Sequence, residues 1–132
     1  AEGDGVAILA VGAMVQVAHG ARELLAEREV EAAVVNCRFV KPMDRQALHR
    51  LERDYRILLT LEENSVVGGF GAGVLDLLEQ DGLSRKGVVR VGLPDEFVTQ
   101  GTREQLLEEV GLTPARVAAT VMDRLQREVD RE

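Results

Sequence analysis

The side chains of this sequence that could do chemistry gather in four short segments, each of which follows an apolar run. The segments cover residues 12–13, 36–42, 62–65 and 92–97. They carry the cations Arg38 and Lys41, the adjacent carboxylates Glu62 and Glu63, and a further carboxylate at Asp95. Such a set suits either an active site with general acids and bases or ion pairs that dock another domain. No histidine lies in these segments, and we therefore favour docking.

A glycine-rich segment, residues 68–73, opens a predicted helix and raises the question of phosphate binding. A P-loop needs Gly-Lys followed by Ser or Thr, and this sequence has no such triplet. The dinucleotide fingerprint needs Gly or Ala three residues after a Gly-x-Gly pair, where this sequence has Val74 or Asp76. Close approach of two backbones at a packing interface explains the glycines better.

The two histidines and the single cysteine have no neighbours in the sequence that would complete a metal site. His19 and His49 lie on predicted helices, and neither has a second ligand at the i+4 spacing of a zinc site. Cys37 has no nearby Cys or His and is expected to be a small buried residue at a strand end. We interpret all three as structural residues.

Hydrophobic periodicity places the chemical segments between alternating strands and helices. Strands are predicted at residues 6–11, 32–35, 55–61 and 88–91, and helices at residues 14–28, 44–51, 68–78, 102–111 and 114–129. Thr113 is the predicted N-cap of the last helix, with Pro114 at its first position. The alternation predicts an α/β fold, a three-layer α/β/α sandwich with a mainly parallel sheet. In such a sheet the carboxyl ends of the strands meet at one edge, where we expect the four segments.

Charge and composition limit the partners of the chain. The net charge of −7 over 132 residues argues against binding nucleic acid or an anionic membrane surface. The longest nearly apolar stretch, residues 6–17, is too short to span a bilayer, and one cysteine fits the reducing cytoplasm. We expect a single domain over residues 1–132, with residues 1–5 as the remnant of a linker from a larger protein.

Three motifs resemble those of 1-deoxy-D-xylulose-5-phosphate synthases. Residues 36–44 resemble the family stretch Asn-x-Arg-Phe-Val-Lys-Pro-Leu-Asp, with Cys37 at the variable position and Met43 in place of Leu. Residues 62–64 and 68–71 look like the Glu-Glu-Asn and Gly-Gly-x-Gly segments of the family, and residues 92–95 match its Gly-Leu-Pro-Asp. The likeness runs in the same order along nearly the whole chain.

This resemblance implies a transketolase-like C-terminal domain, the third domain of a cytoplasmic homodimeric transferase. The family condenses pyruvate with glyceraldehyde 3-phosphate, with release of carbon dioxide, and its product feeds isoprenoid and thiamine biosynthesis. Thiamine diphosphate and magnesium belong to the first two domains, so the resemblance implies no catalytic, cofactor-binding or metal residue here. Gly3-Asp4-Gly5 looks like the opening of the cofactor's metal motif, but it precedes a predicted strand, where the motif would follow one.

The expected role of the chain is therefore structural: it docks the first two domains of its own parent chain and supports the homodimer. The residues that we expect at this docking surface are Arg38, Phe39, Lys41, Pro42, Glu62, Glu63, Asn64, Gly68, Gly69, Phe70, Gly71 and Asp95. Two alternatives stay open. The parent is a transketolase or a 2-oxo acid dehydrogenase beta subunit, or the chain is a module that senses a phosphorylated metabolite through Arg38, Lys41 and the glycine-opened helix.

Overall fold

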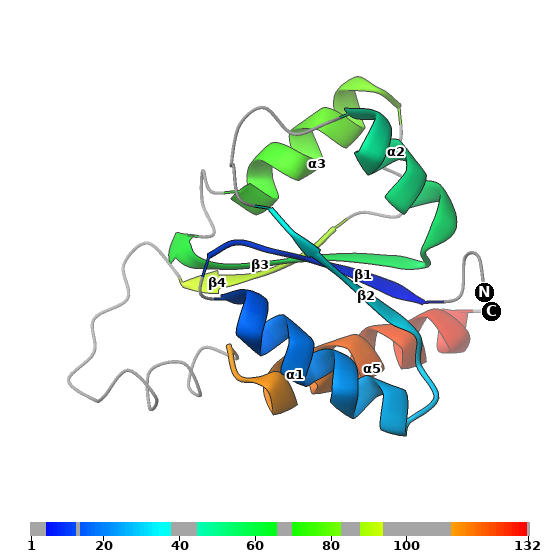
Figure 1. The fold of residues 1–132 in the computed structure, drawn as a ribbon. Helices are drawn as coiled ribbons and strands as arrows, with labels where there is room; N and C mark the ends of the chain where they lie inside the picture. Colours follow the sequence, from blue (N-terminus) through cyan, green and yellow to red (C-terminus); the bar gives the residue numbers. More distant parts are fainter. Residues whose placement is uncertain are drawn as a thin grey trace.

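The structure, a computed structural model, describes residues 5–12, 14–37, 45–65, 70–82, 88–93 and 112–131. The elements are β1 (Val6–Ala10), α1 (Met14–Glu27), β2 (Ala32–Asn36), α2 (Arg45–Asp54), β3 (Ile57–Ser65), α3 (Phe70–Gln80), β4 (Val89–Leu93) and α5 (Pro114–Arg131). Figure 1 shows the sheet as the middle layer, with α2 and α3 on one face and α1 and α5 on the other. The predicted three-layer α/β/α sandwich is confirmed.

The described strands form one sheet in the order β2-β1-β3-β4. Each neighbouring pair is parallel, and the register sets Ala10 of β1 beside Asn36 of β2 and Leu61 of β3. All five side chains of β1 are fully buried, since helices cover this inner strand on both faces. An apolar run without alternation is what a strand buried on both faces requires.

Two apolar cores lie on opposite faces of the sheet because successive strand residues point in opposite directions. Ile8 of β1 belongs to the larger core, together with Leu25 of α1 and Val121 of α5. Leu9 belongs to the smaller core, together with Leu48 of α2 and Leu78 of α3. The apolar faces of these helices therefore lie against the sheet.

The last helix begins as its sequence predicts. The backbone N–H of Arg116 donates to Thr113 Oγ1 at 3.3 Å, which makes Thr113 the N-cap, and α5 begins at Pro114. None of the described helices combines the length and the apolar character needed to cross a membrane.

Three predicted strand boundaries differ from the structure by two residues or more. β3 begins at Ile57 rather than Tyr55, because the N–H of Tyr55 still donates to the carbonyl of Leu51 and closes α2. β3 then continues to Ser65, so residues 62–65 belong to the strand and not to a loop beyond it. β4 likewise continues through Leu93, which pairs with Ser65. This pairing with β4 overrides the weak strand propensity of the polar residues 62–65. The predicted helix at residues 102–111, residue 44 at the start of the second predicted helix, and residues 1–4 lie outside the described residues.

Gly20 lets α1 approach the start of α5 closely. A Cβ atom at Gly20 would lie 2.8 Å from Cγ of Pro114, whose ring cannot rotate away, whereas a Cβ at Gly73 of α3 would meet nothing within 4 Å. We predict that Gly20→Ala destabilises the fold by about 1–3 kcal/mol through overpacking. Gly73→Ala, the matched control, should be neutral or stabilise by up to about 1 kcal/mol through helix propensity. Urea unfolding measures both, and equal effects would contradict the close contact.

Candidate domain-docking site

The site expected from the sequence lies at the carboxyl edge of the sheet. Since the strands are parallel and in register, β1, β2 and β3 all end toward the same side. α1 and α3 both begin at this edge (Figure 1). In open α/β sheets, ligands and partners are bound at this edge because the connecting segments there are free to vary.

Backbone hydrogen bonds fix the described part of this edge. The N–H of Cys37 donates to the carbonyl of Ala10 at 2.9 Å, and the N–H of Val11 donates to that of Leu61 at 3.2 Å. Gly12 adopts a left-handed φ of 61°, and its carbonyl accepts from the N–H of Val15 at 3.2 Å, which starts α1. The segments that leave β1 and β2 are thus anchored at their first residues.

The predicted docking residues divide into two groups. Glu62, Glu63 and Asn64 lie in β3, and Phe70 and Gly71 begin α3, so the structure places both segments at the carboxyl edge. The remaining predicted residues lie outside the described part of the chain: Arg38, Phe39, Lys41, Pro42, Gly68, Gly69 and Asp95.

Glu62 departs from the expectation of an exposed rim carboxylate. Its side chain is only 3% exposed, and it has an interaction partner, as a buried carboxylate requires. Thr60 and Glu62 follow Leu58 at two-residue spacing, so all three face the layer formed by α2 and α3. Glu62 is therefore a buried part of the contact between β3 and this helical layer.

An irregularity in β3 accompanies this polar run. Leu61 pairs with Val91 and Ser65 pairs with Leu93, so β3 uses four residues where β4 uses two. Such a bulge bends the strand and redirects its side chains, and bulges are common beside binding sites. The sequence offered no signal for it beyond the polar run of residues 62–65.

Cys37 is buried at the end of β2, as predicted, and its Sγ lies 3.8 Å from the carbonyl oxygen of Val35. Burial raises the pKa of this thiol to about 11, because the thiolate loses hydration in an apolar environment. Cys37 therefore acts as a packing residue between β2 and the smaller core.

The histidines have different surroundings. His19 is exposed on α1, whereas His49 Nε2 lies 2.7 Å from Oδ2 of Asp81, which follows α3. Sequence reasoning missed this partner because the two residues are 32 positions apart. Among the described residues, no three His, Cys, Asp or Glu side chains are grouped so that they could hold a metal ion.

Comparison with known proteins identifies the family. Residues 1–117 match the sequence pattern of the family described as "Transketolase, C-terminal domain". The chain belongs to this family. This transketolase C-terminal domain is 45% identical over 119 residues to 1-deoxy-D-xylulose-5-phosphate synthase 1 of Geobacter sulfurreducens, covering 90% of the domain and 19% of that protein.

Other relatives agree with this assignment. The synthase of Desulforudis audaxviator is 46% identical over 119 residues, again 90% of this domain and 19% of the relative. The domain therefore spans about a fifth of the length of these curated relatives.

A solved structure gives a close structural match. It is described as a split gene transketolase, an inactive beta4 tetramer. It superposes with a TM-score of 0.83 at 37% identity, covering 95% of this domain and 40% of that chain. The transketolase-like fold implied by the sequence resemblance is thus confirmed.

Thr60 offers a test of the polar arrangement in β3. Its side chain is fully buried, and its Oγ1 has no hydrogen-bond partner within the described part of the chain. We predict that Thr60→Val stabilises the domain by about 1 kcal/mol, since it removes a buried unsatisfied hydroxyl without changing the shape. Thr120→Val is the matched control and should not stabilise, because Thr120 Oγ1 donates to the carbonyl of Arg116 at 2.9 Å. A loss of stability for Thr60→Val in urea unfolding would show that the hydroxyl is hydrogen-bonded.

The raised pKa of Cys37 predicts low reactivity in the folded domain. At pH 8 the fraction of thiolate should be about two-hundredfold lower than in the unfolded chain, because the ordinary thiol pKa is about 8.5 and that of Cys37 is about 11. The rate of alkylation by iodoacetamide should rise with pH up to about 11 in the folded domain. Mass spectrometry measures both rates, and equal rates with and without urea at pH 8 would contradict the burial of this thiol.

Proposed function

We propose that the chain is the C-terminal, structural domain of a homodimeric cytoplasmic enzyme that makes 1-deoxy-D-xylulose 5-phosphate. The reaction condenses pyruvate with glyceraldehyde 3-phosphate and releases carbon dioxide. The observation that carries this proposal is the identity of about 45% to such synthases along 90% of the domain, which corresponds to only 19% of their length. Because the match covers only this part of the synthases, we expect the domain to function together with the other domains of a longer parent protein.

The domain's part in the reaction would be to dock the first two domains of its parent chain and to support the dimer. The geometry supports this role because residues 62–64 and the start of α3 lie at the edge of the sheet where β2 and β4 also end. Glu62 is an exception among the proposed docking residues, since its side chain is buried within the domain.

The chemistry would come from thiamine diphosphate, bound with magnesium by other domains of the parent. This cofactor supplies the carbon nucleophile of such a condensation. We assign no catalytic step and no cofactor contact to this chain, because the sequence resemblance implies that the cofactor-binding residues lie in the first two domains of the parent.

A transketolase parent is the second candidate. The split gene transketolase is 37% identical over 95% of the domain, so this likeness also covers nearly the whole chain. Its identity is lower than that of the synthases, which favours the first candidate.

The assay that separates the candidates uses the full-length parent with pyruvate, glyceraldehyde 3-phosphate, thiamine diphosphate and magnesium. We expect 1-deoxy-D-xylulose 5-phosphate from the parent and no product from the 132-residue chain. Ketol transfer between sugar phosphates would instead identify a transketolase, and a requirement for lipoamide would identify a dehydrogenase. Saturable binding of a phosphorylated metabolite to the chain alone, measured by calorimetry, would support a sensing module.

Substitutions in the parent test the docking role. We predict that Arg38→Glu or Phe70→Ala weakens the homodimer about tenfold or more, because interface anchors of these types contribute about 1.4 kcal/mol or more. Analytical ultracentrifugation measures the dimer, and turnover is measured on the assembled fraction. Arg28→Glu is the control, since Arg28 is exposed beyond the far end of α1. Variants that dimerise fully but lose turnover would place Arg38 or Phe70 in the active site instead.

A further inference from the structure

An Asp-Gly pair, Asp81-Gly82, follows the last residue of α3. Aspartate isomerises most readily before glycine, because glycine has no side chain to shield its backbone nitrogen. The nitrogen of Gly82 would form a bond to Cγ of Asp81, and a carboxyl oxygen would leave with the amide proton and the carboxyl proton as water. The product of this step is a succinimide ring.

Water then opens the ring at one of its two carbonyl groups. Attack at Cγ restores aspartate. Attack at the main-chain carbonyl carbon of Asp81 leaves the chain linked through Cγ, which is isoaspartate. The main chain thereby gains a methylene group, and the former main-chain carbonyl becomes a free carboxylate. The first step releases one water and the second takes one up, so the reaction needs no oxidant and no cofactor.

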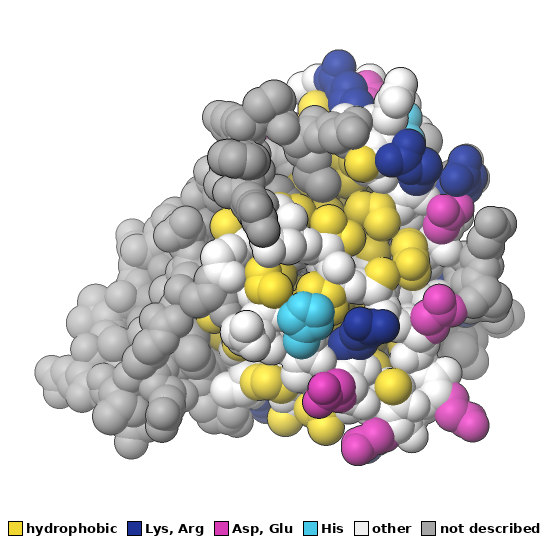
Figure 2. Space-filling view, viewed as in Figure 1, with side chains coloured by type: hydrophobic (Ala, Val, Ile, Leu, Met, Phe, Trp, Pro, Cys, Tyr) yellow, Lys and Arg dark blue, Asp and Glu magenta, His cyan; other side chains and the backbone are white. Residues whose placement is uncertain are grey.

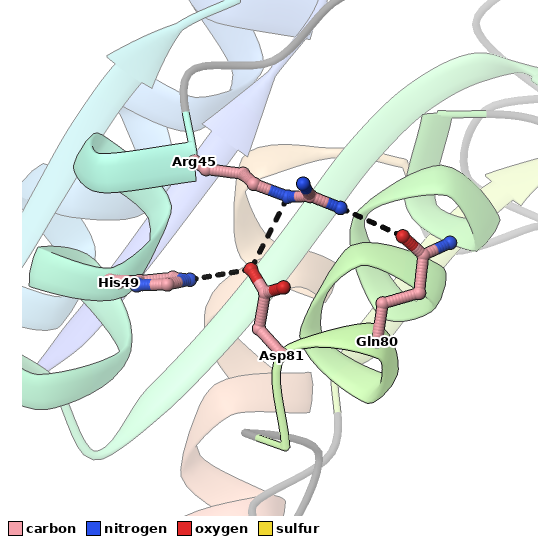
Figure 3. Close-up of polar contacts among 4 residues, drawn as sticks. All are labelled: Arg45, His49, Gln80 and Asp81. Carbon is pink, nitrogen blue, oxygen red and sulfur yellow. Dashed lines mark hydrogen bonds and ion pairs between the residues drawn. The ribbon is translucent and has the colours of Figure 1, made fainter.

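A polar cluster holds the side chain of Asp81, as Figure 3 shows. Its Oδ2 lies 2.7 Å from Nε2 of His49 and 3.3 Å from Nε of Arg45, both in α2. Nη2 of Arg45 also donates to Oε1 of Gln80 at 2.8 Å. We call this group, Arg45, His49, Gln80 and Asp81, the α2–α3 clasp. Rotation of the Asp81 side chain toward the nitrogen of Gly82 breaks both contacts of Oδ2.

The backbone at the Asp-Gly pair is held as well. The N–H of Asp81 donates to the carbonyl of Leu77 at 3.1 Å, which continues the hydrogen bonding of α3 by one residue. The N–H of Gly82, which is the attacking group, donates to the carbonyl of Glu79 at 3.2 Å, and Gly82 has a left-handed φ of 74°. Ring closure needs the nitrogen and Cγ aligned at about 3–3.5 Å, so these bonds must open first.

Burial does not protect the pair. Gly82 is exposed, and the side chain of Asp81 is 20% exposed, so water reaches both residues. The partners of Asp81 are more open still, with Arg45 at 51% and His49 at 43%. Contacts between such exposed groups are weak, and they open locally while the apolar cores stay intact.

We propose that Asp81-Gly82 is a latent modification site: isoaspartate forms there when the α2–α3 clasp opens, and the closed clasp protects the bond. The product does not rebuild the clasp, because the added methylene group and the new carboxylate move the negative charge away from its place beside His49 and Arg45. This inference concerns the chain itself and does not depend on the reaction of its parent.

Ageing of the 132-residue chain near neutral pH, below its unfolding temperature, tests the proposal. Electron-transfer fragmentation of the proteolytic peptide that contains residue 81 measures isoaspartate there and separates it from Asp4-Gly5, the other Asp-Gly pair of the sequence. We expect isoaspartate to form several-fold more slowly in the folded chain than in a synthetic peptide of residues 77–86. His49→Ala and Arg45→Ala should each raise the rate toward that of the peptide. Asp81→Glu should form no such product, since its longer side chain closes a ring poorly.

Two controls separate the clasp from general stability. Arg53→Ala removes the Arg53 Nε–Asp54 Oδ1 pair of 2.8 Å in the last turn of α2 and should leave the rate unchanged. Gly20→Ala weakens the fold at a site outside the clasp. If Gly20→Ala accelerates the reaction as much as His49→Ala, the whole fold protects the bond and the proposal is overturned. Equal rates in the folded chain and the peptide, or unchanged rates in both clasp variants, overturn it as well.

Discussion

The complete burial of β1 is the constraint on which the rest of the structure depends. An inner strand with five side chains at zero exposure needs a helical layer on each face and a strand on each side. Ile8 and Leu9 point into different cores, so the α1–α5 layer and the α2–α3 layer are held to the same strand. Both helical layers and the inner position of β1 follow from this one apolar segment.

The two helical layers are joined to the sheet in different ways. α1 and α5 pack through small apolar contacts, with Gly20 allowing the approach of Pro114, and this layer belongs to the larger core. The α2–α3 layer has the smaller core and adds polar contacts, namely the buried Glu62 of β3 and the contact between Asp81 and His49. Polar contacts are directional, so they restrict the orientation of this layer more closely than apolar contacts do.

The face of the domain that carries β2 has an apolar centre with charged surroundings. Figure 2 shows hydrophobic side chains gathered in the middle of one face over β2, with charged side chains over α1 and α2 around them. β2 is an edge strand among the described residues, and it contains no charged residue or proline to discourage a neighbour. Such a surface is consistent with the proposal that the chain, which spans about a fifth of the length of its relatives, docks on other domains of a longer protein.

The sequence by itself determined the fold class, the parallel sheet, the N-cap at Thr113, the buried Cys37 and the family, because these depend on local periodicity and short motifs. The docking residues remain predictions. Only the tertiary structure decided that residues 62–65 extend β3 through a bulge, that Glu62 is buried, and that Asp81 binds His49. Each of these depends on a neighbour distant in sequence: β4 for the strand extension, the helical layer for Glu62, and a residue 32 positions away for His49. No local pattern encodes such pairings, since they form only when the sheet brings the elements together.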